Sequence, residues 1–168
     1  MLGRNFLILI FAGFFVFNTQ AQRPDVEELK NEVKAAKSIL KAEMEDLRYD
    51  GSKVTYYEVK RETGFKDLEV ILFLRDDYTL FFNGDASSNR VALRVFDKPS
   101  EDPNRILLYE VRNISNKTRS VSEQELNEQL QMYMQDPPLL RKVHIEYEVS
   151  RGRKPERGAI VMMLAYEN

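Results

Sequence analysis

Beyond the first 21 residues, the longest hydrophobic stretch runs from residue 68 to residue 82, where the main interruption is the run Arg75, Asp76 and Asp77. We interpret this stretch as two antiparallel strands, residues 68–74 and 78–82, joined by a tight turn at the two aspartates, which are common turn formers. The first strand is apolar on both faces. A strand of this kind must be covered on both sides, so the pattern predicts a central position in the fold.

A long amphipathic helix is predicted over residues 24–47, before Asp50 and Gly51, which are expected to turn the chain. Its hydrophobic positions recur at steps of three and four and are Val26, Leu29, Val33, Ala36, Leu40 and Leu47. This spacing forms one apolar stripe on a helix. The stripe predicts a helix packed along a sheet, and a coiled-coil contact with a partner is the alternative.

A second helix is predicted over residues 122–135. Ser122 and Glu125 have the spacing of a capping box, and Pro137 and Pro138 are expected to prevent continuation of the helix. The predicted apolar stripe of this helix consists of Leu126, Leu130, Tyr133 and Met134.

The remaining periodicity indicates strands between residues 53 and 115 and a hairpin over residues 141–166. Five strands are expected in the first region, at residues 54–61, 68–74, 78–82, 91–96 and 106–114. In the first strand of the terminal hairpin, hydrophobic and polar residues alternate. The inward set is Val143, Ile145, Tyr147 and Val149, and the outward set is His144, Glu146, Glu148 and Ser150.

This order of elements predicts an α+β fold that is mostly antiparallel β, because many short strands are joined by turns. The expected architecture is a sandwich or a strongly curved sheet with the long N-terminal helix packed on it. A cystatin-like or NTF2-like arrangement of a helix on a curved sheet is the alternative, and it carries no functional implication.

Residues 1–21 have the pattern of a secretory signal peptide. Arg4 precedes a short apolar segment, and Thr19 and Ala21 are small residues at the spacing that a signal peptidase recognises. We expect cleavage after Ala21, which leaves residues 22–168 as a single domain. The sequence therefore predicts an exported protein of the periplasm, cell surface or medium, with an uncleaved membrane anchor as the alternative.

Composition narrows the range of chemistry. The chain has 25 Lys and Arg against 27 Asp and Glu, a balance that predicts no general affinity for nucleic acid. It has one histidine and no cysteine, which excludes cysteine nucleophiles and multi-histidine zinc sites. The sequence contains no phosphate-binding, dinucleotide-binding or nucleophile-elbow motif, so no cofactor is expected.

Four cations lie close together in the turn of the predicted terminal hairpin. They are Arg151, Arg153, Lys154 and Arg157. This basic hairpin tip predicts contact with an anionic partner, such as a polysaccharide, a lipid headgroup or an acidic protein surface. The alternative is a solvated hairpin whose charge discourages edge-to-edge pairing of strands.

Two groups of acidic residues have weaker chemical interpretations. His144, Glu146 and Glu148 share a strand face that fits either metal chelation or an ordinary polar surface, and the ordinary surface is favoured. Asp76 and Asp77 fit a turn better than a catalytic pair.

Two further patterns involve asparagine. The tripeptides that begin at Asn113 and Asn116 match glycosylation acceptors. One loop has polar residues at alternate positions, like the early ligands of a calcium-binding loop. An ordinary connecting loop is favoured, because only one of these residues is a carboxylate. The residues of this loop are Asn83, Asp85, Ser87 and Asn89.

Together these observations favour an exported, non-catalytic binding or assembly domain. Its expected partner is a protein or an anionic envelope component, and a helix-mediated oligomer is a further option. One alternative is a small-ligand carrier with a pocket between helix and sheet, lined by Tyr56, Phe73, Phe81 and Met162. The other alternative is a hydrolase or metal-dependent enzyme that uses His144.

Overall fold

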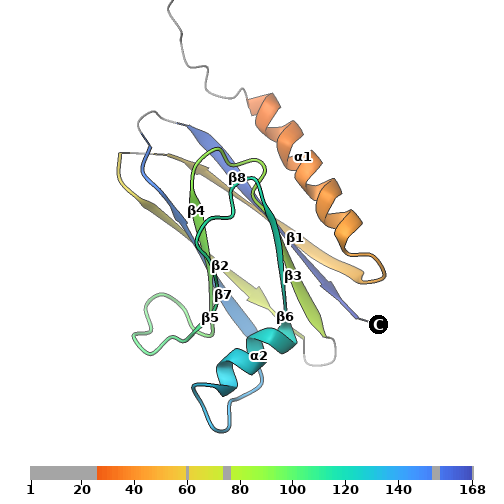
Figure 1. The fold of residues 1–168 in the computed structure, drawn as a ribbon, viewed down its shortest axis with the longest axis vertical. Helices are drawn as coiled ribbons and strands as arrows, with labels where there is room; N and C mark the ends of the chain where they lie inside the picture. Colours follow the sequence, from red (N-terminus) through yellow and green to blue (C-terminus); the bar gives the residue numbers. More distant parts are fainter. Residues whose placement is uncertain (1–25, 60, 74–76, 153–155, 168) are drawn as a thin grey trace, which may run out of the picture.

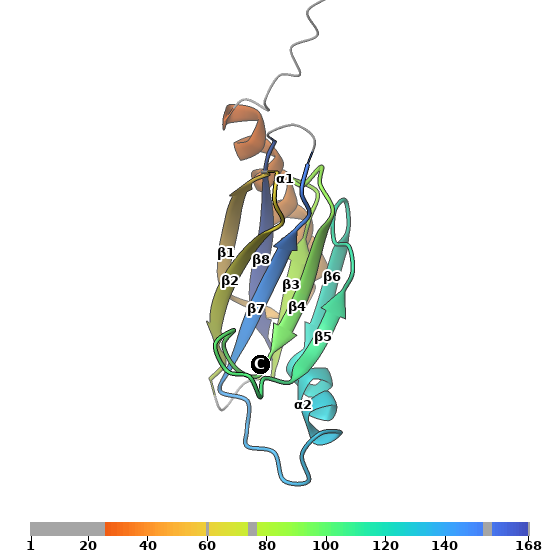
Figure 2. The same cartoon turned by 90° about the vertical axis from the view of Figure 1, so that its left-hand side faces the viewer.

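Two four-stranded antiparallel sheets face each other in the computed structural model, which describes residues 26–59, 61–73, 77–152 and 156–167 (Figure 2). Sheet A has the strand order β1 (Arg48–Glu58), β8 (Arg157–Tyr166), β3 (Tyr78–Asn83) and β6 (Thr118–Ser122). Sheet B has the order β2 (Gly64–Ile71), β7 (Lys142–Val149), β4 (Val91–Phe96) and β5 (Leu107–Val111). The predicted sandwich is confirmed, in place of a single curved sheet. The predicted signal peptide, residues 1–21, lies outside the described residues.

The N-terminal helix α1 (Val26–Glu43) packs on the outer face of sheet A, as predicted (Figure 1). The buried positions of its stripe pack against a strip of side chains on the outer face of β8. That strip consists of Ala159, Val161, Met163 and Ala165. The helix ends at Glu43 and not at the predicted residue 47, because Glu45 has a φ of 47°, outside the helical region, in the turn before β1 begins at Arg48. Neither described helix is long and apolar enough to cross a membrane.

The main core lies between the two sheets. The predicted alternation along β7 is confirmed, because Val143, Ile145, Tyr147 and Val149 are all buried in this core. From sheet A, one face of β8 contributes Ile160, Met162 and Leu164. β8 is therefore covered on both faces, by α1 on one side and by sheet B on the other.

The predicted hairpin over residues 68–82 is wrong. β2 pairs with β7 at the edge of sheet B, whereas β3 pairs with β6 and β8 in sheet A. The chain thus passes from one sheet to the other between these strands, and Asp76 of the predicted turn lies outside the described residues. Neither described helix packs on β2, and Ile71, at its end, and Phe73, just beyond it, are 57% and 60% exposed.

The hairpin predicted over residues 141–166 is also wrong. β7 pairs with β2 and β4 in sheet B, and β8 pairs with β1 and β3 in sheet A. Alternation of hydrophobic residues defines the two faces of a strand but not its neighbours. The connection after Val149 therefore links the two layers of the sandwich instead of folding back within one sheet.

Two smaller features of the strands differ from the prediction. Gly51 lies inside β1, where the pairing with β8 shifts register between Tyr49 and Gly51, so Asp50 and Gly51 form an irregularity in a strand instead of the end of the helix. The short edge strand β6 is not predicted from the sequence pattern, because Val121 alone is buried in it. The described part of the chain thus has six strands before the second helix.

The second helix, α2 (Glu123–Gln131), begins as predicted and ends early. The Glu125 amide donates to Ser122 Oγ at 3.2 Å, and the Ser122 amide donates to Glu125 Oε2 at 2.7 Å, which confirms the capping box. Leu126 and Leu130 are buried. After Gln131 the chain forms turns beyond the end of the sandwich, where most side chains up to Leu139 are exposed before Leu140 rejoins the core.

Candidate binding surface at the α2 end

Exposed hydrophobic side chains gather where the chain leaves α2. We call Met132, Tyr133, Met134 and Leu139 the apolar ridge; Met132 is 77% and Leu139 is 71% exposed. The segment that carries the ridge extends past the two sheets at the lower end of the molecule in Figure 1. The expectation that Tyr133 and Met134 continue the buried stripe of α2 is wrong. Exposed apolar patches on folded proteins mark sites of interaction.

The end of β2 adds two more apolar side chains to this end of the molecule. The Leu72 amide donates to the Arg141 carbonyl at 2.8 Å, so Phe73 follows directly beside the segment that leads into β7. Ile71 pairs with Lys142 across the two strands. Hydrophobic residues from two distant parts of the chain thus border the same end.

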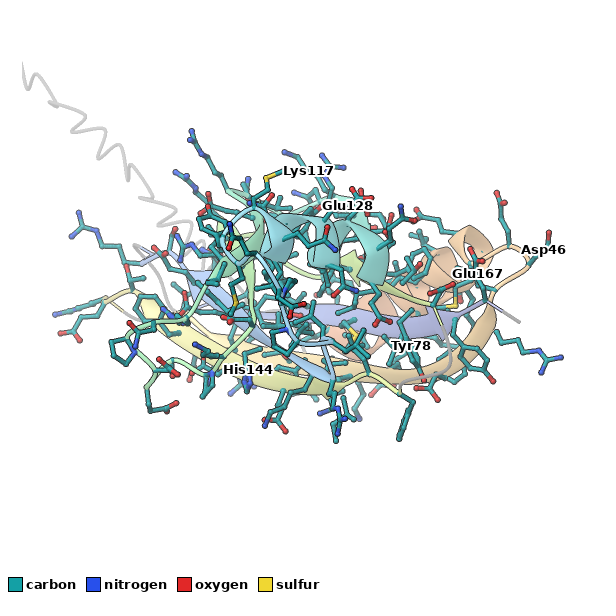
Figure 3. All side chains as sticks on the ribbon, turned by 90° about the horizontal axis from the view of Figure 1, so that it is seen from below. Asp46, Tyr78, Lys117, Glu128, His144 and Glu167 are labelled. Carbon is teal, nitrogen blue, oxygen red and sulfur yellow. The ribbon has the colours of Figure 1, made fainter. Side chains whose placement is uncertain are left out.

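A hollow of about 690 Å³ lies on one side of the ridge, between α2, the start of β3 and the end of β8. We call it the acidic hollow, because its charged lining residues are Asp77, Glu123, Glu128 and Glu167. No lysine or arginine of the described part of the chain lines it. Figure 3 views the molecule from below and shows Glu128 on α2, with Tyr78 and Glu167 to one side of it.

Glu123 is a half-buried carboxylate of the acidic hollow. Burial raises its pKa, a hydrogen bond from the Tyr78 amide at 3.3 Å opposes that shift, and the negative charge of Asp77 raises the pKa further. The net direction is upward, which means that the chain itself compensates the negative charge of this carboxylate only in part.

A groove of about 450 Å³ lies on the other side of the ridge, at the α2 end of sheet B. Its lining is largely apolar and includes Leu130, Met134 and Leu140. We call it the basic groove, because Lys98, Arg141 and Lys142 also line it. Leu139 lines both the groove and the acidic hollow, so it lies between regions of opposite charge.

The three cations of the basic groove differ in how they are paired. Lys98 Nζ lies 3.9 Å from Asp102, and Lys142 Nζ lies 3.1 Å from Glu69. Arg141 is exposed and forms no ion pair with the described residues. Asp97, the one acid among the described lining residues, accepts a hydrogen bond from the Ile106 amide at 2.6 Å. The free positive charge of the groove is therefore centred on Arg141.

A second candidate site surrounds the single histidine of the sequence, on the outer face of sheet B. His144 lines a pocket of about 250 Å³ together with Glu69, Arg105 and Glu146. Its Nε2 atom lies 3.8 Å from Glu69 Oε2 and has no hydrogen-bond partner among the described residues. Glu69 itself accepts a hydrogen bond from Lys142 at 3.1 Å, and this bond is the main reason why its pKa is lowered.

Arg94 occupies the centre of the same outer face. It bonds Glu148 at 2.8 Å, Glu110 at 2.9 Å and Glu146 at 3.1 Å, and these contacts, that of Glu148 first, raise its pKa. Glu146 also binds Arg105 at 3.2 Å. The two carboxylates considered as metal ligands with His144 are thus already paired with arginine, and the described residues hold no group of three metal-ligating side chains.

The polar loop considered as a calcium site is bonded within itself. Asn83, at the end of β3, is fully buried; its Nδ2 donates to Asp85 and to Thr118, and its Oδ1 accepts from the Asp85 amide. Ser87 Oγ donates to the Asn89 carbonyl at 2.9 Å. These contacts fit the favoured interpretation as a connecting loop, here between β3 and β4. Of the other pair considered for chemistry, Asp76 lies outside the described residues and Asp77 lines the acidic hollow.

The pocket expected for a ligand carrier is not formed by its four predicted residues. Phe81 is buried beneath α1, whereas Met162 is buried between the sheets. Tyr56 and Phe73 are both exposed. The four side chains therefore lie in separate environments, because alternate residues of a strand face opposite layers.

The basic hairpin tip corresponds to the connection between β7 and β8, at the end of the molecule opposite α2 (Figure 2). Arg151 and Arg157 are exposed, while Arg153 and Lys154 lie outside the described residues. Arg157 lines a hollow that also includes Glu32 and Glu156. Acidic neighbours thus lie near one of the four cations, and binding of an anionic partner by the tip stays a prediction.

No model of a protein family matches the chain, and no curated protein matches it. Any functional conclusion therefore depends on the geometry of this chain, in which the α2 end combines exposed apolar side chains with charges of both signs.

Proposed function

We propose that the chain is an exported, non-catalytic binding or assembly domain that contacts a protein partner through its α2 end. The observation that carries the proposal is the apolar ridge, because Met132 and Leu139 expose large hydrophobic side chains on a segment that projects from the sandwich. Hiding such side chains from water is the main driving force of protein association.

The neighbouring charges support a protein partner. Charged groups at the rim of an apolar patch select partners and orient them, since the core of a protein interface is apolar and its rim is polar. The acidic hollow and the basic groove flank Leu139 in this way. Export rests on the signal-peptide pattern of residues 1–21, and the basic hairpin tip is a second proposed contact, for an anionic component of the envelope.

Photo-crosslinking in the native cells tests the proposal. A benzophenone amino acid in place of Leu139 is expected to form a covalent adduct with a polypeptide, whereas the same group in place of Tyr56, an exposed side chain on β1, serves as the matched control. Adducts from position 139 that are no more abundant than those from position 56 would remove the α2 end as a binding surface.

A catalytic role for His144 is the alternative proposal, favoured by the pocket that brings it close to Glu69. The non-catalytic interpretation is preferred because Glu69 and Glu146, two acids of that pocket, are bonded to Lys142 and to arginines. On any substrate found by screening, undiminished turnover by His144→Ala would dispose of the alternative.

A further inference from the structure

We infer that the partner at the α2 end is a second copy of this chain, held in a two-fold symmetric dimer. The inference rests on the proposed binding role of this surface and names its occupant. It depends on three features of the described residues: the apolar ridge, the opposite charges on its two sides, and the size of the surface.

The charges on the two sides of the ridge have opposite signs. On one side are four carboxylates with no cation of the described chain among the lining residues. On the other side are three cations, of which Arg141 has no ion pair with the described residues and the single lining acid, Asp97, is engaged by the Ile106 amide. Leu139 belongs to both linings. The α2 end therefore has a negative half and a positive half that meet at Leu139 of the apolar ridge.

A two-fold axis along the ridge makes this surface complementary to itself. In such a dimer each contact of residue i with residue j of the second copy has its symmetric equivalent, in which j contacts i. The axis lies in the plane of the interface and runs along the ridge. Rotation by 180° about it exchanges the two sides, so the acidic hollow of each copy lies opposite the basic groove of the other. The apolar ridge of one copy packs against the apolar ridge of the other, which removes Leu139 from water in both copies.

Partners of one charge sign fit only half of the surface. An anionic bilayer or a nucleic acid would be attracted by Arg141 and repelled by Glu123 and Glu128, and a basic peptide would meet the reverse. A second copy carries both signs in the required arrangement. It therefore satisfies both halves of the α2 end at once.

The surface also has the size that a specific interface needs. Eleven described residues line the acidic hollow and nine line the basic groove, with Leu139 common to both. Tyr78, Leu130 and Leu140 are buried, but the other lining residues together with the exposed Met132 and Tyr133 approach the lower end of the roughly 20–30 residues a side of a standard interface. Met132 and Met134 add flexible apolar side chains, which adapt to the surface that they meet.

Charge-reversal variants test the inference. The measured quantity is the molar mass of the purified protein in solution at low salt. Interfaces of standard size have dissociation constants in the micromolar range or below. At roughly 100 μM protein, the wild type is therefore expected to have the mass of a dimer. Glu128→Lys alone and Arg141→Glu alone each place like charges opposite each other and should raise the dissociation constant roughly a hundredfold. An equal mixture of the two variants should dimerise again, because both symmetric contacts then join opposite charges.

Matched controls separate this effect from a change in net charge. Glu62→Lys and Lys66→Glu make the same reversals at the other end of the sandwich, where both residues line a hollow beside the start of β2, and they should leave the dimer intact. All four substituted side chains are exposed, so the variants are expected to fold, and circular dichroism spectra that match the wild type check this.

Each outcome decides the inference. A monomeric wild type, single variants as dimeric as the wild type, or a mixture no more associated than its components would overturn it. A monomer whose position 139 still crosslinks to a different protein would overturn the second copy as partner and keep the proposed binding role. A monomer without any adduct at position 139 would remove both.

Discussion

Replacement of Arg94 by methionine is expected to destabilise the sandwich by removing the cation that joins three strands of sheet B. Arg94 lies on β4 and bonds Glu110 on β5, and Glu146 and Glu148 on β7, at distances of 2.8 to 3.1 Å. Methionine keeps most of the apolar stem while deleting the guanidinium group, so the change isolates the polar contacts.

The structure sets the expected magnitude. The side chains of Glu110 and Glu148 are about one-third exposed, so each lost pair is worth about 0.5 kcal/mol. Glu146 is the most enclosed of the three and loses a stronger bond of about 1.5 kcal/mol, but it keeps its contact with Arg105 and is not left unpaired. Arg94→Met should therefore lower the free energy of unfolding by about 2–3 kcal/mol.

Urea denaturation followed by circular dichroism measures this loss. Arg94→Lys retains the charge but not the planar fork that reaches three carboxylates, so it should lose about half as much as Arg94→Met. Glu110→Gln, which removes one exposed partner, should lose less than about 1 kcal/mol. A loss below about 0.5 kcal/mol for Arg94→Met would show that the network adds nothing to stability and would refute the reasoning.

Three further predictions address packing and pH. Leu40→Ala, at a fully buried position of α1 against sheet A, should cost about 2–5 kcal/mol in thermal unfolding, and a loss below about 1 kcal/mol would contradict the packing of the helix. Gly84→Ala should cost about 1–3 kcal/mol in the same measurement, since the added methyl group meets the Ile114 carbonyl; wild-type stability would show that the loop shifts freely. Burial raises the pKa of Glu123 above its ordinary value of 4.5, so the stability that its protonated carboxyl contributes below that value is lost as the pH rises through the raised value. Glu123→Gln should therefore become more stable relative to the wild type with increasing pH, in urea titrations at protein concentrations too low for association, and the opposite trend would disprove the upward shift.

The features that depend on local sequence can be predicted from it. Ser122 and Glu125 satisfy each other across three residues, so the start of α2 follows from their spacing alone. Val143 and Ile145 alternate with polar neighbours, which defines the buried face of β7. In both cases the determining contacts lie within a few residues or on one side of a strand.

The pairing of the strands depends on distant residues and is not predictable in the same way. Residues 68–82 look like a hairpin because two apolar segments flank a polar turn, yet β2 finds its partner in β7 and β3 finds partners in β6 and β8. Hydrophobic content alone does not distinguish an edge strand from a central one. Phe73 is the clearest case, since it is predicted to be covered and is 60% exposed.

The sequence pattern hides the candidate binding surface for a related reason. Tyr133 and Met134 continue the periodicity of Leu126 and Leu130, so a helix extended to residue 135 would bury them. The helix ends at Gln131 instead, and both side chains are exposed. The opposite charges beside Leu139 come from segments far apart in the sequence, and only the fold brings them to one end.

The position of β8 has a consequence for how the protein is made. This strand is the last of the described strands in chain order, yet it lies between β1 and β3 and pairs Tyr166 with both Arg48 and Tyr78. During synthesis, α1 and β1 emerge long before the strand that joins them to the rest of sheet A. Sheet A therefore closes only after residue 166 has left the ribosome; until then β1 has no partner strand and α1 lacks most of the surface on which it packs.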